Sequence, residues 1–195
     1  MDSFLFCLLL VAAIGLGAKD QIMVAQLSDS LAAGEGDGAR RPVPLLVLGI
    51  TGACMSAAVM AYAGMTMAQI LPRRAALMLI AFALAIAAFE LFWPVRIKAA
   101  AEPTRSLGAI GLVLLWRQFG DAARFTVFAF AAGAAYPLTA FIGGALGGVA
   151  SVSLGWSIGH HRLKHWPLRY ARLAMGVALI IAAIFIGLGA RYATL

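Results

Sequence analysis

Two similar segments place polar and ionisable residues in the middle of long apolar stretches. They are residues 15–21, GLGAKDQ, and residues 118–124, QFGDAAR. A charge at the centre of a membrane helix costs roughly 2.5–3.5 kcal/mol, so such residues usually pair with one another or mark an ion or solute pathway. A polar, glycine-containing break that recurs in two halves of a chain points to a transport site. The chemistry expected of these segments is binding of a small ion or solute by carboxylate, amide and cationic groups.

The rest of the chain has the composition of a membrane protein. Hydrophobic residues make up 63% of it and charged residues 12%, with a mean hydropathy of +0.94, which excludes an ordinary soluble domain. Because no basic residue precedes Lys19, we do not expect the first apolar stretch to be a cleaved signal peptide. An all-α integral membrane protein with six transmembrane helices is predicted, since about 20 residues cross the hydrocarbon core. The predicted spans are 4–31, 43–66, 74–93, 106–133, 137–159 and 168–190.

The two halves of the chain also resemble each other outside these segments. Residues 49–56 and 144–151 share two glycines three apart and a serine four further on, and Pro42 and Pro137 fall in the same register. Small and hydroxyl residues along one helix stripe allow close helix packing. We therefore predict an internal repeat.

Each half contains three spans, an odd number, so the second half must be inverted relative to the first. The predicted organisation is one transmembrane domain built from two three-helix repeats, residues 1–98 and 99–195. Ser56 and Ser151 are equivalent in this repeat and could add hydroxyl groups to a central pathway, although packing explains them equally well.

Basic residues concentrate in the loops after the first, third and fifth spans, which indicates that these loops are cytoplasmic. Both termini are then predicted outside the cytoplasm of an inner (plasma) membrane of the bacterial type. This bias accounts for the net charge of +7, and no nucleic-acid partner is expected. The residues concerned are Arg40, Arg41, Arg96, Lys98, Arg105, Arg162, Lys164 and Arg169.

The two segments resemble the duplicated E-x-G-D-[KR]-[ST] motif of the Gdt family, the Golgi-type calcium/manganese–proton exchangers of the transmembrane protein 165 kind. Gly17, Lys19 and Gln21 match this motif in the first copy, and Gly120 and Asp121 match it in the second. The resemblance implies six spans in inverted repeats and exchange of a divalent cation for protons. It implies no resident cofactor, because Mn²⁺ or Ca²⁺ would be the transported substrate. Carboxylate oxygens suit both ions.

The chain departs from this motif mainly at its acids. Gly15 and Gln118 stand where the family has glutamate, and Ala18 stands where it has aspartate. Of the four expected acids only Asp121 remains in place, so it is the one predicted metal ligand. Asp20 is an acid at a position where the family has serine or threonine.

The charges of the two segments nearly cancel, because Lys19 and Arg124 oppose Asp20 and Asp121. Unpaired charges are expensive in a membrane, so the pairs Lys19–Asp121 and Asp20–Arg124 are predicted. Weak or absent binding of Mn²⁺ and Ca²⁺ follows as a hypothesis. The predicted pathway residues are Asp121, Gln118, Asp20, Lys19, Gln21, Arg124, Ser56 and Ser151.

Three functions remain open from the sequence. The favoured one is a diverged transporter of a cation or another small solute. A transport-incompetent structural or regulatory homologue is the second. The third is a small-solute or amino-acid exporter of the lysine-exporter type, because the basic central residues of this chain would suit a carboxylate-bearing solute. An enzyme is not expected, since no nucleophile–base pair or metal triad lies at a matching depth. The expected partners are the lipid bilayer and the small ion or solute, and a homo- or hetero-oligomer is compatible with these features.

Glu90 is an acid inside the third predicted span. It lies near the end of the third span beside Trp93, and its counterpart in the repeat is the apolar Phe185. We interpret it as a carboxylate at the membrane interface.

Overall fold

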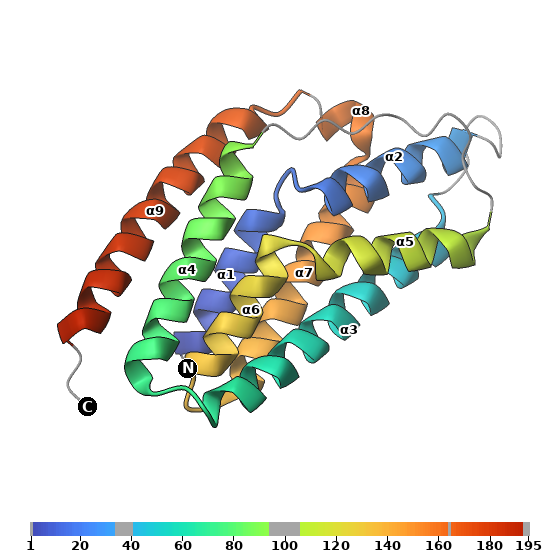
Figure 1. Cartoon of the computed structure of the whole chain (residues 1–195). Helices are drawn as coiled ribbons and strands as arrows, with labels where there is room; N and C mark the ends of the chain where they lie inside the picture. The colour runs from blue at the N-terminus through green and yellow to red at the C-terminus, as the bar shows by residue number, and fades with distance from the viewer. Residues whose placement is uncertain (1, 34–40, 94–105, 164, 193–195) are drawn as a thin grey trace.

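The computed structural model of the protein describes residues 2–33, 41–93, 106–163 and 165–192, and in these ranges it contains helices and no strands (Figure 1). The predicted all-α class is confirmed for this part of the chain. The boundary predicted at residues 98 and 99 lies outside it, as do Arg40, Arg96, Lys98, Arg105 and Lys164. The helices are α1 (Asp2–Gly15), α2 (Lys19–Ala33), α3 (Val43–Ala68), α4 (Arg73–Phe92), α5 (Leu107–Phe119), α6 (Ala122–Gly133), α7 (Pro137–Ile158), α8 (His160–Leu163) and α9 (Leu168–Tyr192).

Four described helices, α3, α4, α7 and α9, are long and apolar enough to cross a membrane. The bent pair α1 and α2 makes a fifth candidate if it is counted as one span, whereas α5 and α6 are shorter apolar helices. Large apolar side chains such as Phe82, Phe185 and Trp116 are 64%, 71% and 80% exposed, and a lipid environment would cover them. The chain is therefore an all-helical, membrane-embedded protein, while the six-span count and the inverted repeat stay predictions.

Both polar segments singled out in the sequence are helix breaks. The first separates α1 from α2 with a bend of 58°, and Gly17 there has a φ of +68°, which glycine adopts without steric cost. The second separates α5 from α6 at Gly120 and Asp121. Asp121 is extended and its carboxylate accepts from the Ala123 amide at 3.4 Å, so it caps α6. The predicted spans 4–31 and 106–133 are thus each made of two helices.

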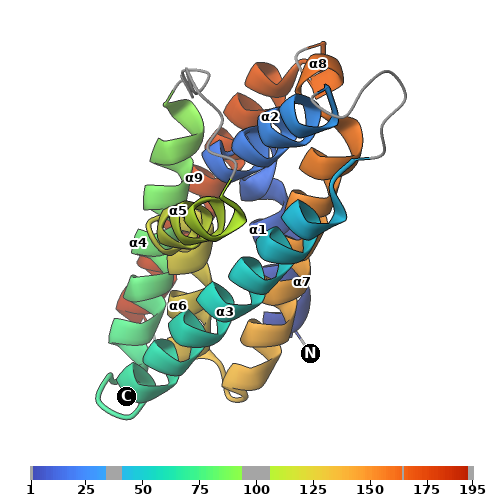
Figure 2. The same cartoon turned by 90° about the vertical axis from the view of Figure 1, so that its right-hand side faces the viewer.

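The helices beyond the breaks leave the main bundle. In Figure 1, α1, α4, α6, α7 and α9 run roughly along one direction, while α2 and α5 turn away from it to the same side. Figures 1 and 2 both show the start of α1 and the end of α9 at the end of the bundle that holds the α3–α4 and α6–α7 turns. The opposite end holds α2 and α8.

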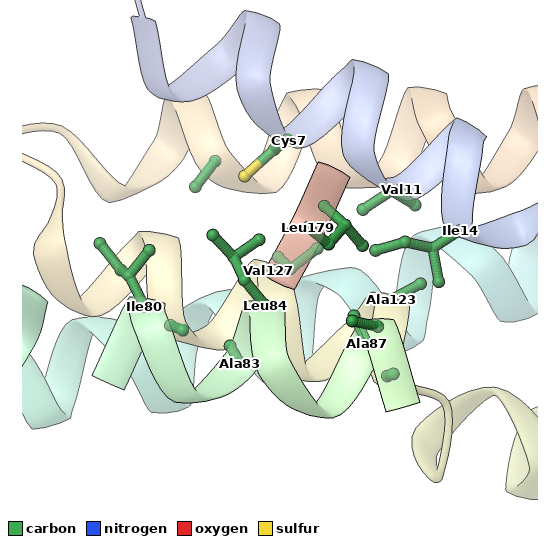
Figure 3. Close-up of a cluster of buried hydrophobic side chains, with 14 of the residues drawn as sticks. Cys7, Val11, Ile14, Ile80, Ala83, Leu84, Ala87, Ala123, Val127 and Leu179 are labelled. Atoms are coloured by element: carbon green, nitrogen blue, oxygen red, sulfur yellow. The ribbon is translucent and has the colours of Figure 1, made fainter. Parts of the chain in front are cut away.

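Glycines of α7 bring its backbone close to α1. A Cβ atom at Gly147 would lie 2.7 Å from the Leu8 carbonyl oxygen and 3.0 Å from the Ala12 nitrogen. Beside this contact lies the main apolar cluster, in which Val11 of α1 and Leu179 of α9 belong to the same group of buried side chains (Figure 3). Close backbone approach of this kind is how helices associate in lipid, where burial of apolar surface between them adds little.

We predict that Gly147→Leu lowers the thermal denaturation midpoint of the detergent-purified protein, because the new side chain must push α1 from α7. Overpacking of this kind costs roughly 1–3 kcal/mol. Gly189→Leu is the matched control, since a Cβ atom there would meet nothing within 4 Å. Equal midpoints for the two variants would contradict the α1–α7 contact.

Candidate functional site

The first break is closed by side chains of α2 and α7. The Gly17 amide donates to Gln21 Oε1 at 2.6 Å, and the Gln21 amide group donates to the Ser151 carbonyl at 3.1 Å. Ser151 Oγ in turn donates to the Gly15 carbonyl at 3.0 Å. Gln21 and Ser151 are almost fully buried, so the backbone groups freed by the break find partners inside the protein, as a membrane interior requires.

The second break is held by two carboxylates. The side chain of Glu90, at the end of α4, accepts from the Ala122 amide at 3.0 Å, next to the cap that Asp121 provides. The first amides of a helix have no partner within it and carry partial positive charge, so both carboxylates stabilise the start of α6. Glu90 is half-buried and contacts the break directly, which its interpretation as an interfacial carboxylate did not include.

Arg172 of α9 connects the two breaks. One guanidinium nitrogen donates to the Leu16 carbonyl in the first break at 3.0 Å. The other donates to the Glu90 carbonyl at 3.1 Å. Arg172 is 7% exposed, and its charge interacts favourably with Glu90, Asp121 and Asp20. Helices from both halves of the chain therefore meet through one side chain.

Glu90 and Arg172 are the two site residues that the sequence analysis missed. Glu90 lies in the last turn of an apolar span and Arg172 in the first turns of another. In the predicted topology these two ends lie on the same side of the membrane. A signal was therefore present, because an ionisable residue inside a span indicates a functional position. The apolar repeat counterpart of Glu90, Phe185, argues against a site role from the sequence alone.

The charged residues around the two breaks form one polar cluster, which consists of Asp20, Glu90, Asp121, Arg124 and Arg172. Arg124 is the most deeply buried of them, with 2% of its surface exposed. Its guanidinium donates to the Gly144 carbonyl at 3.2 Å and lies against Gly148, where any side chain would overlap it. Its charge interacts favourably with Asp121 and Asp20. A buried charge without such compensation is strongly destabilising.

The direct ion pairs expected from the sequence are not formed in the described part of the chain. Asp20 is buried and accepts from the Gln21 amide at 2.8 Å, while it interacts with Arg124 only through charge. Lys19 begins α2 and is exposed. It lines an open pocket of about 280 Å³ together with Phe89, Glu90 and Trp93. The break turns the start of α2 outward, which carries Lys19 away from Asp121.

Gln118 and Ser56, two further predicted pathway residues, bond to α3 and not to the backbone of either break. Gln118 is fully buried, and its amide donates to the Gly49 carbonyl at 3.5 Å while its Oε1 has no partner. Ser56 Oγ donates to the Ala53 carbonyl of its own helix at 3.2 Å. Ser56 therefore stays outside the breaks, whereas the equivalent Ser151 supports the first one.

The donor set does not match a pre-formed divalent cation site. Among the described residues, no group of three or more His, Cys, Asp or Glu side chains is arranged to hold a metal ion. Asp121, the predicted metal ligand, caps α6. Gly15, where the motif would place glutamate, has no room for a side chain, because a Cβ atom there would lie 2.5 Å from Ser151 Oγ and 2.8 Å from Ser151 Cβ.

Comparisons of the chain with protein-family models, with curated proteins and with solved structures find no match. The resemblance to the Gdt family therefore rests on the residues of the two segments.

Removing the Arg124 charge is predicted to destabilise the protein by about 3–5 kcal/mol, because Asp20 and Asp121 would lose the larger part of the positive charge that compensates them. Arg124→Met should lower the denaturation midpoint well below that of Arg191→Met, a control at the exposed end of α9. Adding Asp20→Asn to Arg124→Met should recover part of the loss. A double variant no more stable than Arg124→Met would contradict this charge balance.

Proposed function

We propose that this chain is a membrane transporter in which a small ion or solute passes between the two helix breaks. The observation that carries the proposal is the link from the first break through Arg172 and Glu90 to the second. Broken helices meeting at a buried polar cluster are the usual structural basis of a transport site. Ionisable residues inside a membrane are costly, so their presence there usually marks a functional position.

The scaffold we infer is that of the Gdt exchangers, with α1–α2 and α5–α6 each counted as one span. In its support, α3 and α7 begin next to the equivalent prolines Pro42 and Pro137. Both halves of the first broken helix pack on α7, and both halves of the second pack on α3. This exchange of partners is what two inverted three-helix repeats would produce. The termini then lie outside the cytoplasm of an inner (plasma) membrane.

The solute is inferred from the charges of the cluster. Asp20, Glu90 and Asp121 provide three carboxylates, which favours a cation exchanged for protons, with Mn²⁺ or Ca²⁺ as the family-type substrates. Arg124 and Arg172 oppose them, which favours a diverged site with weaker affinity for divalent ions. The two arginines also keep open the export of a carboxylate-bearing solute, and a chain that moves nothing would be a structural or regulatory homologue.

Flux into proteoliposomes tests the proposal. We expect the purified protein to exchange Mn²⁺ or Ca²⁺ for protons slowly, and Asp121→Asn to abolish this exchange. Ala18→Asp combined with Gln118→Glu restores two motif acids and should accelerate it. Gly15→Glu should be introduced only with Ser151→Gly, because Ser151 fills the space that the glutamate needs.

Each flux outcome separates the alternatives. Exchange only in the variant with restored acids would favour a transport-incompetent homologue. If no cation moves in either protein, counterflow of amino acids tests the exporter.

Weak affinity for divalent ions is a separate prediction. Calorimetric titration of the purified protein with micromolar Mn²⁺ should give no saturable heat, because two buried guanidinium groups oppose the three carboxylates. The variant with Ala18→Asp and Gln118→Glu should bind more tightly. Tight binding to the unmodified protein would contradict the assignment of a diverged site.

A further inference from the structure

Lys19 and Glu90 line one open pocket of about 280 Å³, together with Phe89 and Trp93. The two side chains have opposite charges, but they do not form an ion pair in the described part of the chain. Lys19 is exposed, and its ammonium group forms no hydrogen bond with the described residues. The pocket therefore presents a cation and an anion, held apart, to a ligand.

The Glu90 side chain is held in position without using all of its hydrogen-bonding capacity. Its Oε2 accepts from the Ala122 amide at 3.0 Å, and the Arg172 guanidinium donates to its backbone carbonyl at 3.1 Å. Its Oε1 has no hydrogen-bond partner among the described residues. An ionised carboxylate accepts through both oxygens, so Glu90 can bind a donor from a ligand while it stays bonded to α6.

Two aromatic rings flank these charges. Phe89 and Trp93 are 63% and 61% exposed, and their ring centroids lie 5.6 Å apart with an angle of 41° between the rings. The face of such a ring attracts a positive charge. Because α4 starts at the α3–α4 turn and ends beside this pocket, the pocket lies at the end of the bundle that holds α2 and α8 (Figures 1 and 2). Exposed tryptophan at the end of a membrane helix is typical of the level of the lipid headgroups.

The ligand that suits this pocket is small and carries separate negative and positive groups. The volume is at the low end of ligand pockets, which span about 300–1,000 Å³. A phosphate suits the Lys19 ammonium, and a primary ammonium can donate a charge-assisted bond to Glu90 Oε1 and contact the ring of Trp93. Phosphatidylethanolamine combines both groups in one headgroup. Phosphatidylglycerol has no cation for Glu90, and phosphatidylcholine has no N–H donor for it.

We propose that this pocket binds the headgroup of phosphatidylethanolamine, with the phosphate on Lys19 and the ammonium on Glu90 and Trp93. Lys19 begins α2 after the first break, and Glu90 contacts the start of α6 after the second. The bound lipid therefore connects the two breaks from the surface of the protein. This lipid site does not depend on the proposed transport function.

The lipid selectivity of the purified, delipidated protein tests the site. Native mass spectrometry with equal amounts of phosphatidylethanolamine and phosphatidylglycerol should show one tightly retained phosphatidylethanolamine per chain. Lys19→Met should weaken this binding roughly tenfold, because it removes one hydrogen bond between charged groups. Arg191→Met, at the exposed end of α9, is the control and should leave the binding unchanged.

Glu90→Gln gives the most specific result, because it removes the charge and keeps an oxygen acceptor for the Ala122 amide. Loss of the carboxylate removes both the attraction for an ammonium and the repulsion of an anionic lipid. The preference for phosphatidylethanolamine over phosphatidylglycerol should therefore fall roughly tenfold. A purely structural role for Glu90 would change the stability of the protein and leave this preference unchanged. Trp93→Leu should also weaken the binding, whereas Trp116→Leu, at an exposed tryptophan of α5, should not.

Soluble competitors separate a lipid from a free solute as the ligand. Glycerophosphoethanolamine, which has the headgroup without the chains, should displace the bound lipid at high concentration, and free alanine should not displace it. Equal retention of the two lipids, or a preference that survives in both Lys19→Met and Glu90→Gln, would overturn the proposal. Displacement by alanine would also overturn it and would assign the pocket to a soluble zwitterion. If the flux measurements show no transport but the lipid preference is found, the proposed function fails and the lipid site stands.

Discussion

Everything in this structure depends on one constraint: backbone groups freed by a break in a membrane helix must find partners within the protein. The two breaks occur in different helices, and each is closed by side chains from other parts of the chain. In the first break, Ser151 and Arg172 donate hydrogen bonds to backbone carbonyl groups. Glu90 supplies a bond to the second. The arrangement of α4, α7 and α9 around the breaks follows from this requirement as much as from apolar packing.

Glycines of α7 make the arrangement geometrically feasible. At Gly147 the missing side chain lets the α1 backbone approach, and at Gly148 it leaves space for the Arg124 guanidinium. The same helix contributes the Gly144 carbonyl to Arg124 and Ser151 to the first break. One face of α7 thus provides both close packing and the polar contacts that a buried charge needs.

The departures from the Gdt motif acquire a physical meaning in this setting. Where the motif would place a glutamate, Gly15 leaves room for Ser151, whose hydroxyl closes the break instead. At the second break Asp121 is joined by a second acid, Glu90, which comes from α4, outside the motif. Buried Arg124 and Arg172 lie beside these acids and compensate part of their charge.

The sequence by itself determined the class of protein and the positions of both breaks. Long apolar stretches interrupted by glycine and charge are local features, and Gly17 and Asp121 carry the signals that end one helix and begin the next. Only the tertiary structure decided which side chains serve the breaks. Lys19 was expected to pair inward and lies at the surface instead, whereas Glu90 and Arg172 reach the breaks from helices distant in the sequence. The reason is physical. In lipid a freed backbone group must form a hydrogen bond with a partner that the helix packing brings near, and that packing is not a local property of the chain.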